Sequence, residues 1–144
     1  MTLLKHLKLG VIALSLSLNA NAATAEVVAV VSSKSTVTTL SDNQVVDIFL
    51  GKVHRFPNGE TVHAVDQNED SATREEFYLK VTGKSPAQVK AHWSKIIFTG
   101  RGNPPKEVGN SADVKKYLSV NPNAIGYIDA KSVDETVRVV LSRN

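Results

Sequence analysis

The chain has 144 residues, no cysteine and a formal net charge of +3. The lack of cysteine excludes a disulfide framework and thiolate metal sites. Removal of residues 1–22 would take away Lys5 and Lys8, so that 17 basic residues become 15 against 14 acidic ones. A nearly neutral domain lacks the basic surface on which nucleic-acid binding depends, so we expect no nucleic-acid partner.

Residues 1–22 show the three-part pattern of a secretory signal peptide. Basic side chains come first, a short apolar run follows, and Ala20-Asn21-Ala22 is a small-residue cleavage signature. The apolar run is shorter than the roughly 20 residues that span a bilayer. We therefore expect cleavage after Ala22 or Ala25, a periplasmic protein, and no membrane insertion after cleavage.

The rest of the chain, residues 26–144, predicts one α/β domain. EVVAVV at 26–31 is nearly continuous in apolar residues, which is typical of a strand buried on both faces, as in a parallel sheet. Ser41 and Gln44 form a capping box, and the helix that follows ends at Gly51. A turn at 56–59 then leads to a short strand at 61–65.

DQNEDSATREEF, at 66–77, leads into a helix that continues to about Val81 and is closed by Gly83. Ser85-Pro86 starts the next helix, which places Val89, Trp93, Ile96 and Ile97 on one face, with Trp93 expected in the core. The glycine- and proline-rich stretch 100–109 predicts an irregular loop, and Asn110 or Ser111 caps a helix that includes Leu118. Strands are predicted at 125–128 and 137–141. Alternating strands and helices imply βα crossovers.

The trio Ser71-Ala72-Thr73 lies between a strand and the start of a helix. Backbone N–H groups at a helix start are unpaired and carry the positive end of the helix dipole, and two hydroxyls add further donors. This arrangement suits phosphate or sulfate. The alternative is plain helix capping by Asp70 or Ser71, with no ligand.

Few residues point to catalysis or to a metal. His63 and Asp66 could lie near each other and be joined by His54, but their spacing matches no established metal motif. No nucleophile–base motif or nucleotide loop is present. We expect solvated or packed histidines, no catalytic residue, no metal and no cofactor.

Four segments resemble, in their order, the PstS-like phosphate-binding subunits of ABC transporters, which are type II periplasmic binding proteins. The segments are LSDNQVVDIFLGK at 40–52, SATREEF at 71–77, GNSADV at 109–114 and AIGYID at 124–129. The resemblance implies a tetrahedral oxyanion, held by hydroxyls and helix-start amides without a cofactor. The candidate ligand residues that it suggests are Ser71, Thr73, Arg74, Ser32, Ser33, Asn110 and Ser111.

The chain departs from this pattern in two ways. Full members have two lobes that close on the ligand, whereas this chain is similar only to the second lobe. Gln67 stands where the family pattern resembles an arginine, Ala72 replaces the glycine of a Ser-Gly-Thr loop, and several carboxylates surround the turn.

Two functional hypotheses follow. The first is a solute-binding domain for phosphate or a related oxyanion, working with an ABC permease or pairing with a second copy of the chain that supplies the missing wall. The alternative is an interaction module of the cell envelope that kept the lobe fold without ligand transport. An enzyme that uses His63 and Asp66 is the third interpretation.

Overall fold

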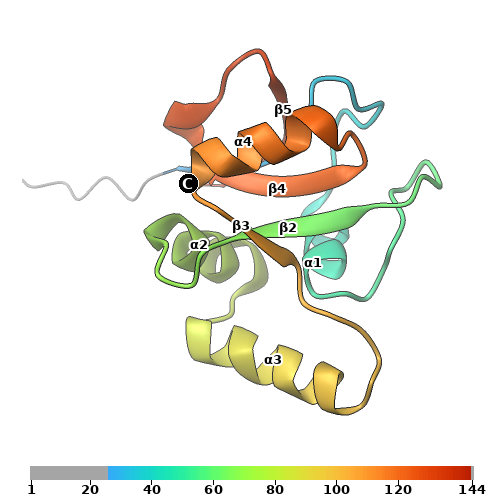
Figure 1. Ribbon diagram of the computed structural model, residues 1–144, viewed down its shortest axis with the longest axis vertical. Helices are drawn as coiled ribbons and strands as arrows, with labels where there is room; N and C mark the ends of the chain where they lie inside the picture. The colour runs from blue at the N-terminus through green and yellow to red at the C-terminus, as the bar shows by residue number, and fades with distance from the viewer. Residues whose placement is uncertain (1–25, 144) are drawn as a thin grey trace, which may run out of the picture.

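The computed structural model describes residues 26–143, which form a five-stranded sheet with helices on both faces (Figure 1). The predicted signal peptide at 1–22 lies outside the described residues. The strands are β1 (Val27–Ser32), β2 (His63–Gln67), β3 (Lys106–Gly109), β4 (Ala124–Asp129) and β5 (Val137–Arg143). The α-helices are α1 (Asp42–Phe49), α2 (Ala72–Phe77), α3 (Pro86–Phe98) and α4 (Ser111–Val120), with a π-helical turn η1 (Tyr78–Thr82) and a 3-10 turn η2 (Ala130–Ser132).

The strand order is β3-β2-β4-β1-β5, and β1 runs against both of its neighbours. Strand β2 is parallel to β3 and to β4. The predicted burial of β1 on both faces is confirmed, because all six of its residues are buried. The parallel direction suggested by its composition is wrong. An apolar run of this kind indicates that both faces of the strand are buried, and it does not indicate the direction of the strand.

Two hydrophobic clusters lie on opposite faces of the sheet. One face packs against α1, α2, η1 and α3 through side chains that include Phe49, Phe77 and Tyr127. The other face packs against α4, where Val114 and Leu118 meet Val30 of β1. This alternation along β1 and β4 explains why both strands are apolar at nearly every position.

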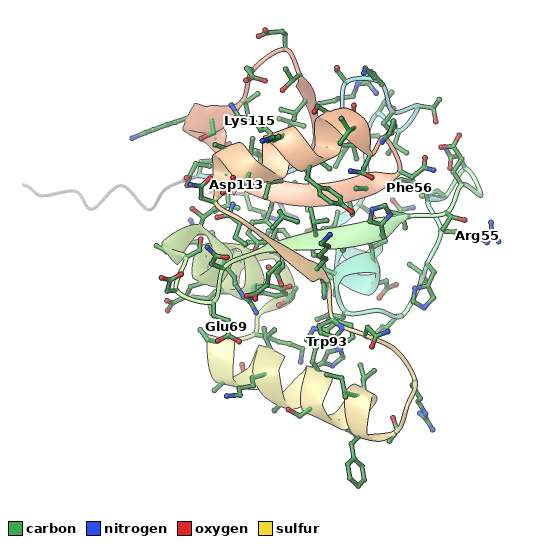
Figure 2. The ribbon with its side chains drawn as sticks, in the orientation of Figure 1. Arg55, Phe56, Glu69, Trp93, Asp113 and Lys115 are labelled. Carbon is green, nitrogen blue, oxygen red and sulfur yellow. The ribbon has the colours of Figure 1, made fainter. Side chains whose placement is uncertain are left out.

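The predicted helices are present, with start signals that act as expected. Ser41 and Ser85 each form a capping box, and Gly83 ends the helical segment that η1 continues from α2. Only part of the predicted apolar face of α3 is buried. Trp93 is buried and points from α3 toward the rest of the chain, whereas Ile97 is 52% exposed (Figure 2).

The predicted irregular loop at 100–109 is wrong over its last four residues, which form the edge strand β3. Its sequence, KEVG, has no run of apolar or β-branched residues that would mark a strand. It forms because its backbone pairs with β2 through Val65 and Asp66. Across residues 26–143, no helix has both the length and the hydropathy that crossing a bilayer requires.

Gly51 is a position in the fold where a side chain would be poorly tolerated. Its φ is +76°, and a Cβ built there would lie 2.7 Å from the Cη2 atom of Trp93. We predict that Gly51→Ala lowers the free energy of unfolding by about 1–2 kcal/mol for the left-handed backbone and by roughly 1–3 kcal/mol more for the collision.

Gly59→Ala is the matched control for this prediction. Its φ is +88°, but no atom lies within 4 Å of the added Cβ, so only the backbone cost of about 1–2 kcal/mol applies. Urea unfolding of both variants measures the difference. Equal losses in the two variants would show that Trp93 does not confine Gly51.

Candidate functional site

Two helices begin side by side at the carboxyl edge of β2, β3 and β4. Helix α2 follows β2 after the short loop 68–71, and α4 follows β3 at Asn110. Because the three strands point the same way, both helix starts face one hollow of about 450 Å³. We call it the helix-start hollow, and it is lined by Gln67, Asn68, Asp70, Ser71, Thr73, Gly109, Asn110, Ser111, Ala112, Asp129 and Ser132.

Local sequence sets each helix start. The Ser71 hydroxyl accepts the backbone N–H of Arg74 at 3.1 Å, and Asn110 Oδ1 accepts that of Asp113 at 3.1 Å. The sequence left open whether Asn110 or Ser111 caps α4, and the structure selects Asn110. The first amides of each helix have no acceptor within that helix, so both positive dipole ends point toward the hollow.

Thr73 and Ser111 meet on the carboxylate of Asp129. The Thr73 hydroxyl donates to Asp129 Oδ1 at 3.0 Å, and the Ser111 hydroxyl donates to Oδ2 at 3.4 Å. The backbone N–H of Asp129 in turn donates to Ser111 Oγ at 3.3 Å. The hollow therefore combines hydroxyl and amide donors with the Asp129 carboxylate, and Asp70 adds a second carboxylate to its lining.

Gln67 joins the two helix starts from beneath. It is 1% exposed, and its Oε1 atom accepts the Ser71 hydroxyl at 2.8 Å. Its Nε2 atom donates to Ser111 Oγ at 3.2 Å and to the carbonyl of Tyr127 at 3.0 Å. Gln67 thus acts as a neutral link at the position where the resemblance suggested an arginine.

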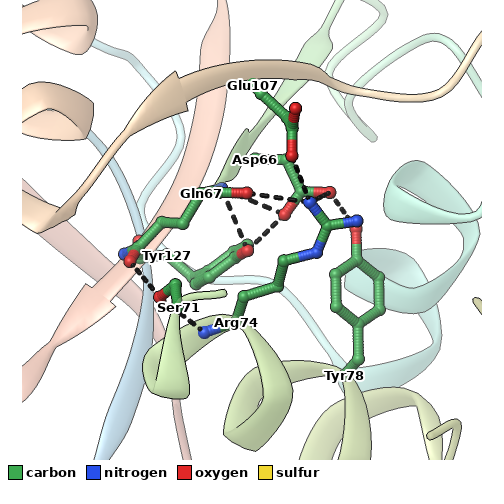
Figure 3. Close-up of polar contacts among 7 residues, drawn as sticks. All are labelled: Asp66, Gln67, Ser71, Arg74, Tyr78, Glu107 and Tyr127. Atoms are coloured by element: carbon green, nitrogen blue, oxygen red, sulfur yellow. Dashed lines mark hydrogen bonds and ion pairs between the residues drawn. The ribbon is translucent and has the colours of Figure 1, made fainter. Parts of the chain in front are cut away.

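Arg74 does not reach the helix-start hollow, although the sequence grouped it with Ser71 and Thr73. Its Nη1 atom donates to the carbonyl of Gln67 and to Glu107, each at 2.8 Å, and lies 3.8 Å from Asp66 Oδ2. Figure 3 shows the guanidinium beside Asp66 and Glu107, away from Ser71. The carboxylates draw the cation to the other side of α2, and none of the residues that line the hollow is basic.

Asp66 is a buried carboxyl held by two tyrosines. It is 3% exposed, and it accepts hydrogen bonds from the hydroxyls of Tyr78, at 2.7 Å, and Tyr127. Burial raises the pKa of Asp66, while the Tyr127 hydrogen bond and the Arg74 charge oppose that rise. Burial and the Asp66 charge also raise the pKa of both tyrosines, which therefore stay protonated donors.

Ser32 and Ser33 do not join the other candidate residues. Because β1 is antiparallel to β4, Val27 lies opposite Asp129 and Val31 lies opposite Ile125. The carboxyl end of β1 is consequently at the far edge of the sheet. There Ser32 Oγ accepts the backbone N–H of Lys34 at 3.1 Å. The family resemblance grouped these two serines with the other candidates, and the antiparallel direction of β1 separates them.

His63 and Asp66 do not form a pair. Three positions apart on β2, they point to opposite faces of the strand. His63 Nε2 lies 3.2 Å from the Tyr117 hydroxyl, and burial followed by the Lys106 charge lowers the pKa of His63. Over the described residues, no group of three or more His, Cys, Asp or Glu side chains is placed to hold a metal ion.

Asp129 was not among the site residues predicted from the sequence, and Gln67 was identified only as a departure from the family pattern. One signal could have found Asp129, since it is the polar residue at the end of the buried strand AIGYID. Ligands in α/β sheets gather outside the carboxyl ends of strands. The linking role of Gln67 depends on partners at positions 111 and 127, which no local pattern indicates.

Comparison with known proteins shows the fold. No protein-family model matches the sequence, and no curated protein matches it. Among solved structures, 81% of the chain superimposes on 45% of a Clostridium perfringens protein described as a phosphate ABC transporter substrate-binding protein with bound phosphate, at 23% identity and a TM-score of 0.64. It also superimposes on an ABC-type phosphate transport receptor from Vibrio cholerae, with 19% identity, 46% of that chain covered and a TM-score of 0.53. A third match is PstS from Borrelia burgdorferi, with 12% identity, 47% of that chain covered and a TM-score of 0.60.

The chain spans less than half the length of each of these structures. It therefore has the α/β fold of about one half of a PstS-type binding protein, which confirms the prediction of a single lobe. Its assignment to the second lobe stays a prediction. At these identities the likeness establishes the fold and leaves the ligand to be argued from the site itself.

The raised pKa of Asp66 predicts that the stability of the fold depends on pH. Because the pKa of Asp66 in the folded protein is raised above its ordinary value of 3.8, the contribution of Asp66 to stability is complete below pH 3.8 and is lost as pH rises through the folded pKa. Asp66→Asn does not titrate. We predict that the stability of the wild type relative to Asp66→Asn is greatest below pH 3.8 and falls toward pH 7.

Urea unfolding of both proteins from pH 3 to pH 7 tests this prediction, since all other titrating groups are shared. A relative stability that rises with pH would show that Arg74 outweighs burial at Asp66.

Proposed function

We propose that the helix-start hollow binds phosphate or a similar tetrahedral oxyanion. The observation that carries the proposal is the convergence of two helix N-termini, at Ser71 and Asn110, on one hollow that four hydroxyl-bearing residues also line. Helix-start amides and hydroxyls are the donors that oxyanions accept in proteins. The solved structures of the same half-fold support this choice, because one of them is named with bound phosphate.

The amides of Ala72 and Thr73 on α2, and of Ser111 and Ala112 on α4, belong to first turns and lack intrahelical acceptors. They can surround an anion from two sides. The Ser71 and Thr73 hydroxyls, which now donate to Gln67 and Asp129, can rotate to donate to it instead. Backbone dipoles thus supply the attraction that an arginine would otherwise give.

The Asp129 carboxylate makes binding depend on whether the anion carries a proton. A carboxylate in the hollow repels a fully deprotonated anion but accepts a hydrogen bond from one that carries a proton. Phosphate and arsenate carry such a proton at neutral pH, and sulfate does not. The proposed ligand class is therefore a protonated tetrahedral oxyanion.

The hollow is one wall of a site, so the bound anion stays in contact with water. In a two-lobed protein, closure excludes water and strengthens each hydrogen bond. We expect a dissociation constant in the millimolar range for this chain alone. A second copy of the chain, or an ABC permease to which the anion is delivered, would supply the opposite wall.

The proposal also includes export of the domain to the periplasm and a part in the uptake of the anion. The signal-like pattern of residues 1–22 and the names of the structurally similar proteins support a periplasmic domain of an ABC-type phosphate system. The ligand chemistry alone does not require transport, so the binding step is tested first.

The direct test is calorimetry and thermal unfolding with phosphate, arsenate and sulfate, against chloride at equal ionic strength. At ten times its dissociation constant, phosphate raises stability by about 1.4 kcal/mol, which shifts the Tm by a few degrees, roughly 3–6 °C, in a domain of this size. We predict that Ser71→Ala abolishes most of this shift because it removes both a donor and the cap of α2.

Ser85→Ala is the matched control, since Ser85 caps α3 in the same way but lies outside the hollow. Each variant loses about 1 kcal/mol of stability with its cap. Only Ser71→Ala is expected to lose the phosphate response. A wild type that shows no response at 50 mM phosphate (about ten times a millimolar-range dissociation constant) beyond that of chloride would refute the proposal.

Asp129→Asn tests the choice of anion. Asn keeps an acceptor for Thr73 and Ser111 but removes the negative charge, so sulfate binding is expected to strengthen by about tenfold or more relative to phosphate. Asp134→Asn, which neutralises a carboxylate paired with Lys115 elsewhere on the surface, should leave the ratio unchanged. An unchanged ratio in Asp129→Asn would show that the carboxylate does not meet the anion.

A further inference from the structure

A second concavity lies on the other side of α2. It has a volume of about 540 Å³ and lies between α2 and η1, helix α3, and the segment that leads into β3. We call it the α2–α3 groove. Its walls include the apolar side chains Tyr78, Val89, Trp93, Ile97, Pro104 and Pro105. The helix-start hollow shares none of its lining residues with this groove.

Helix α3 carries apolar side chains that the domain itself does not cover. Trp93 and Val89 are buried, and His92 Nε2 lies 2.9 Å from the carbonyl of Leu50, so the inner side of the helix is anchored. Ile97, which lines the groove, is nevertheless 52% exposed, and Phe98, which follows it outside the lining, is 93% exposed. Grouped exposure of large apolar side chains beside a concavity is typical of a surface that another molecule covers.

The charged residues that line the groove are mostly acidic. Four carboxylates line it against two cations, and Arg74 is already shared between Glu107 and Asp66. Glu69 and Glu75, both exposed at the α2 side, enter no ion pair that the structure describes within 26–143. An acidic rim beside an apolar wall favours a cationic, partly apolar occupant and disfavours nucleic acid or an anionic membrane surface.

Trp93 lines the same groove. Its indole Nε1 is buried and has no hydrogen-bond partner among the described residues. Figure 2 shows Glu69 and Trp93 facing the space between α3 and the elements above it. Trp93 is also the one tryptophan in the chain, so its fluorescence and its indole N–H resonance are free of signals from any other tryptophan.

We propose that the α2–α3 groove docks a segment of another protein in which a basic side chain lies next to an apolar one. The apolar side chain packs against Trp93 and Ile97, and the basic head meets Glu69 and Glu75. A cavity of this size accommodates two or three side chains, which suits a short linear segment. This proposal is independent of anion binding, because it uses different residues and the opposite charge.

The test uses the protein as processed by the cell that expresses it, with three acetylated and amidated peptides without tryptophan. The first has the sequence Leu-Arg-Phe-Lys-Leu, the second carries Glu in place of the basic residues, and the third carries Ser in place of the apolar ones. We expect only the first to change Trp93 emission and the indole N–H resonance saturably, with an affinity that falls as salt increases.

Two variants locate the contacts. The double change Glu69→Lys and Glu75→Lys is expected to weaken binding of the first peptide by at least tenfold, and Ile97→Ser by a similar factor. The matched control is Glu60→Lys with Glu135→Lys, which changes the net charge equally at exposed positions outside the groove and should leave binding unchanged.

Each other outcome overturns the proposal. No response of Trp93 at millimolar peptide, an equal response to the acidic peptide, or full binding by the Glu69 and Glu75 double variant would show that charge and groove do not select the partner. A Trp93 signal that changes with protein concentration alone, together with a dimer mass, would assign the surface to a second copy of the chain. Loss of phosphate binding in the hollow leaves these outcomes unaffected.

Discussion

The hydrogen bonds between Tyr127, Asp66 and Gln67 hold together the part of the structure on which both surfaces depend. Tyr127 on β4 donates its hydroxyl to Asp66 on β2 and accepts the backbone N–H of Gln67 at 3.1 Å. Its ring stacks on Phe77 of α2, with the centroids 4.1 Å apart. The carboxyl ends of β2 and β4, and the helix α2 that follows β2, are thereby fixed to one side chain. A buried network of this kind is stable only when every member is satisfied.

This arrangement explains the distribution of charge around α2. A buried carboxyl is costly unless donors and a cation meet it, and Tyr78, Tyr127 and Arg74 meet Asp66. Arg74 is thereby kept on the groove side of α2. The helix-start hollow is left with amides, hydroxyls and the carboxylates of Asp70 and Asp129. The proposed ligand is for this reason an anion that carries a proton, bound weakly.

Helix α2 therefore separates two surfaces of different chemistry. Ser71 and Thr73 on its first turn face the hollow, whereas Glu75 faces the α2–α3 groove. In a protein with a second lobe, part of the surface around the hollow would be enclosed. Within residues 26–143 no segment covers either surface. The two hypotheses drawn from the sequence, anion binding and protein interaction, apply to different sides of one helix.

Local sequence determined most of the secondary structure, because its signals act over a few residues. The caps at Ser41 and Ser85, the stop at Gly83 and the apolar run in β1 needed no distant partner to be read correctly. The ordered segments also predicted a half-size PstS-like fold. Only the tertiary structure decided the direction of β1, the pairing of β3 with β2, the withdrawal of Arg74 toward Asp66 and the convergence of Ser71 with Ser111 on Gln67. Each of these depends on partners far apart in the chain, whose contact is set by strand order and burial and not by the residues on either side.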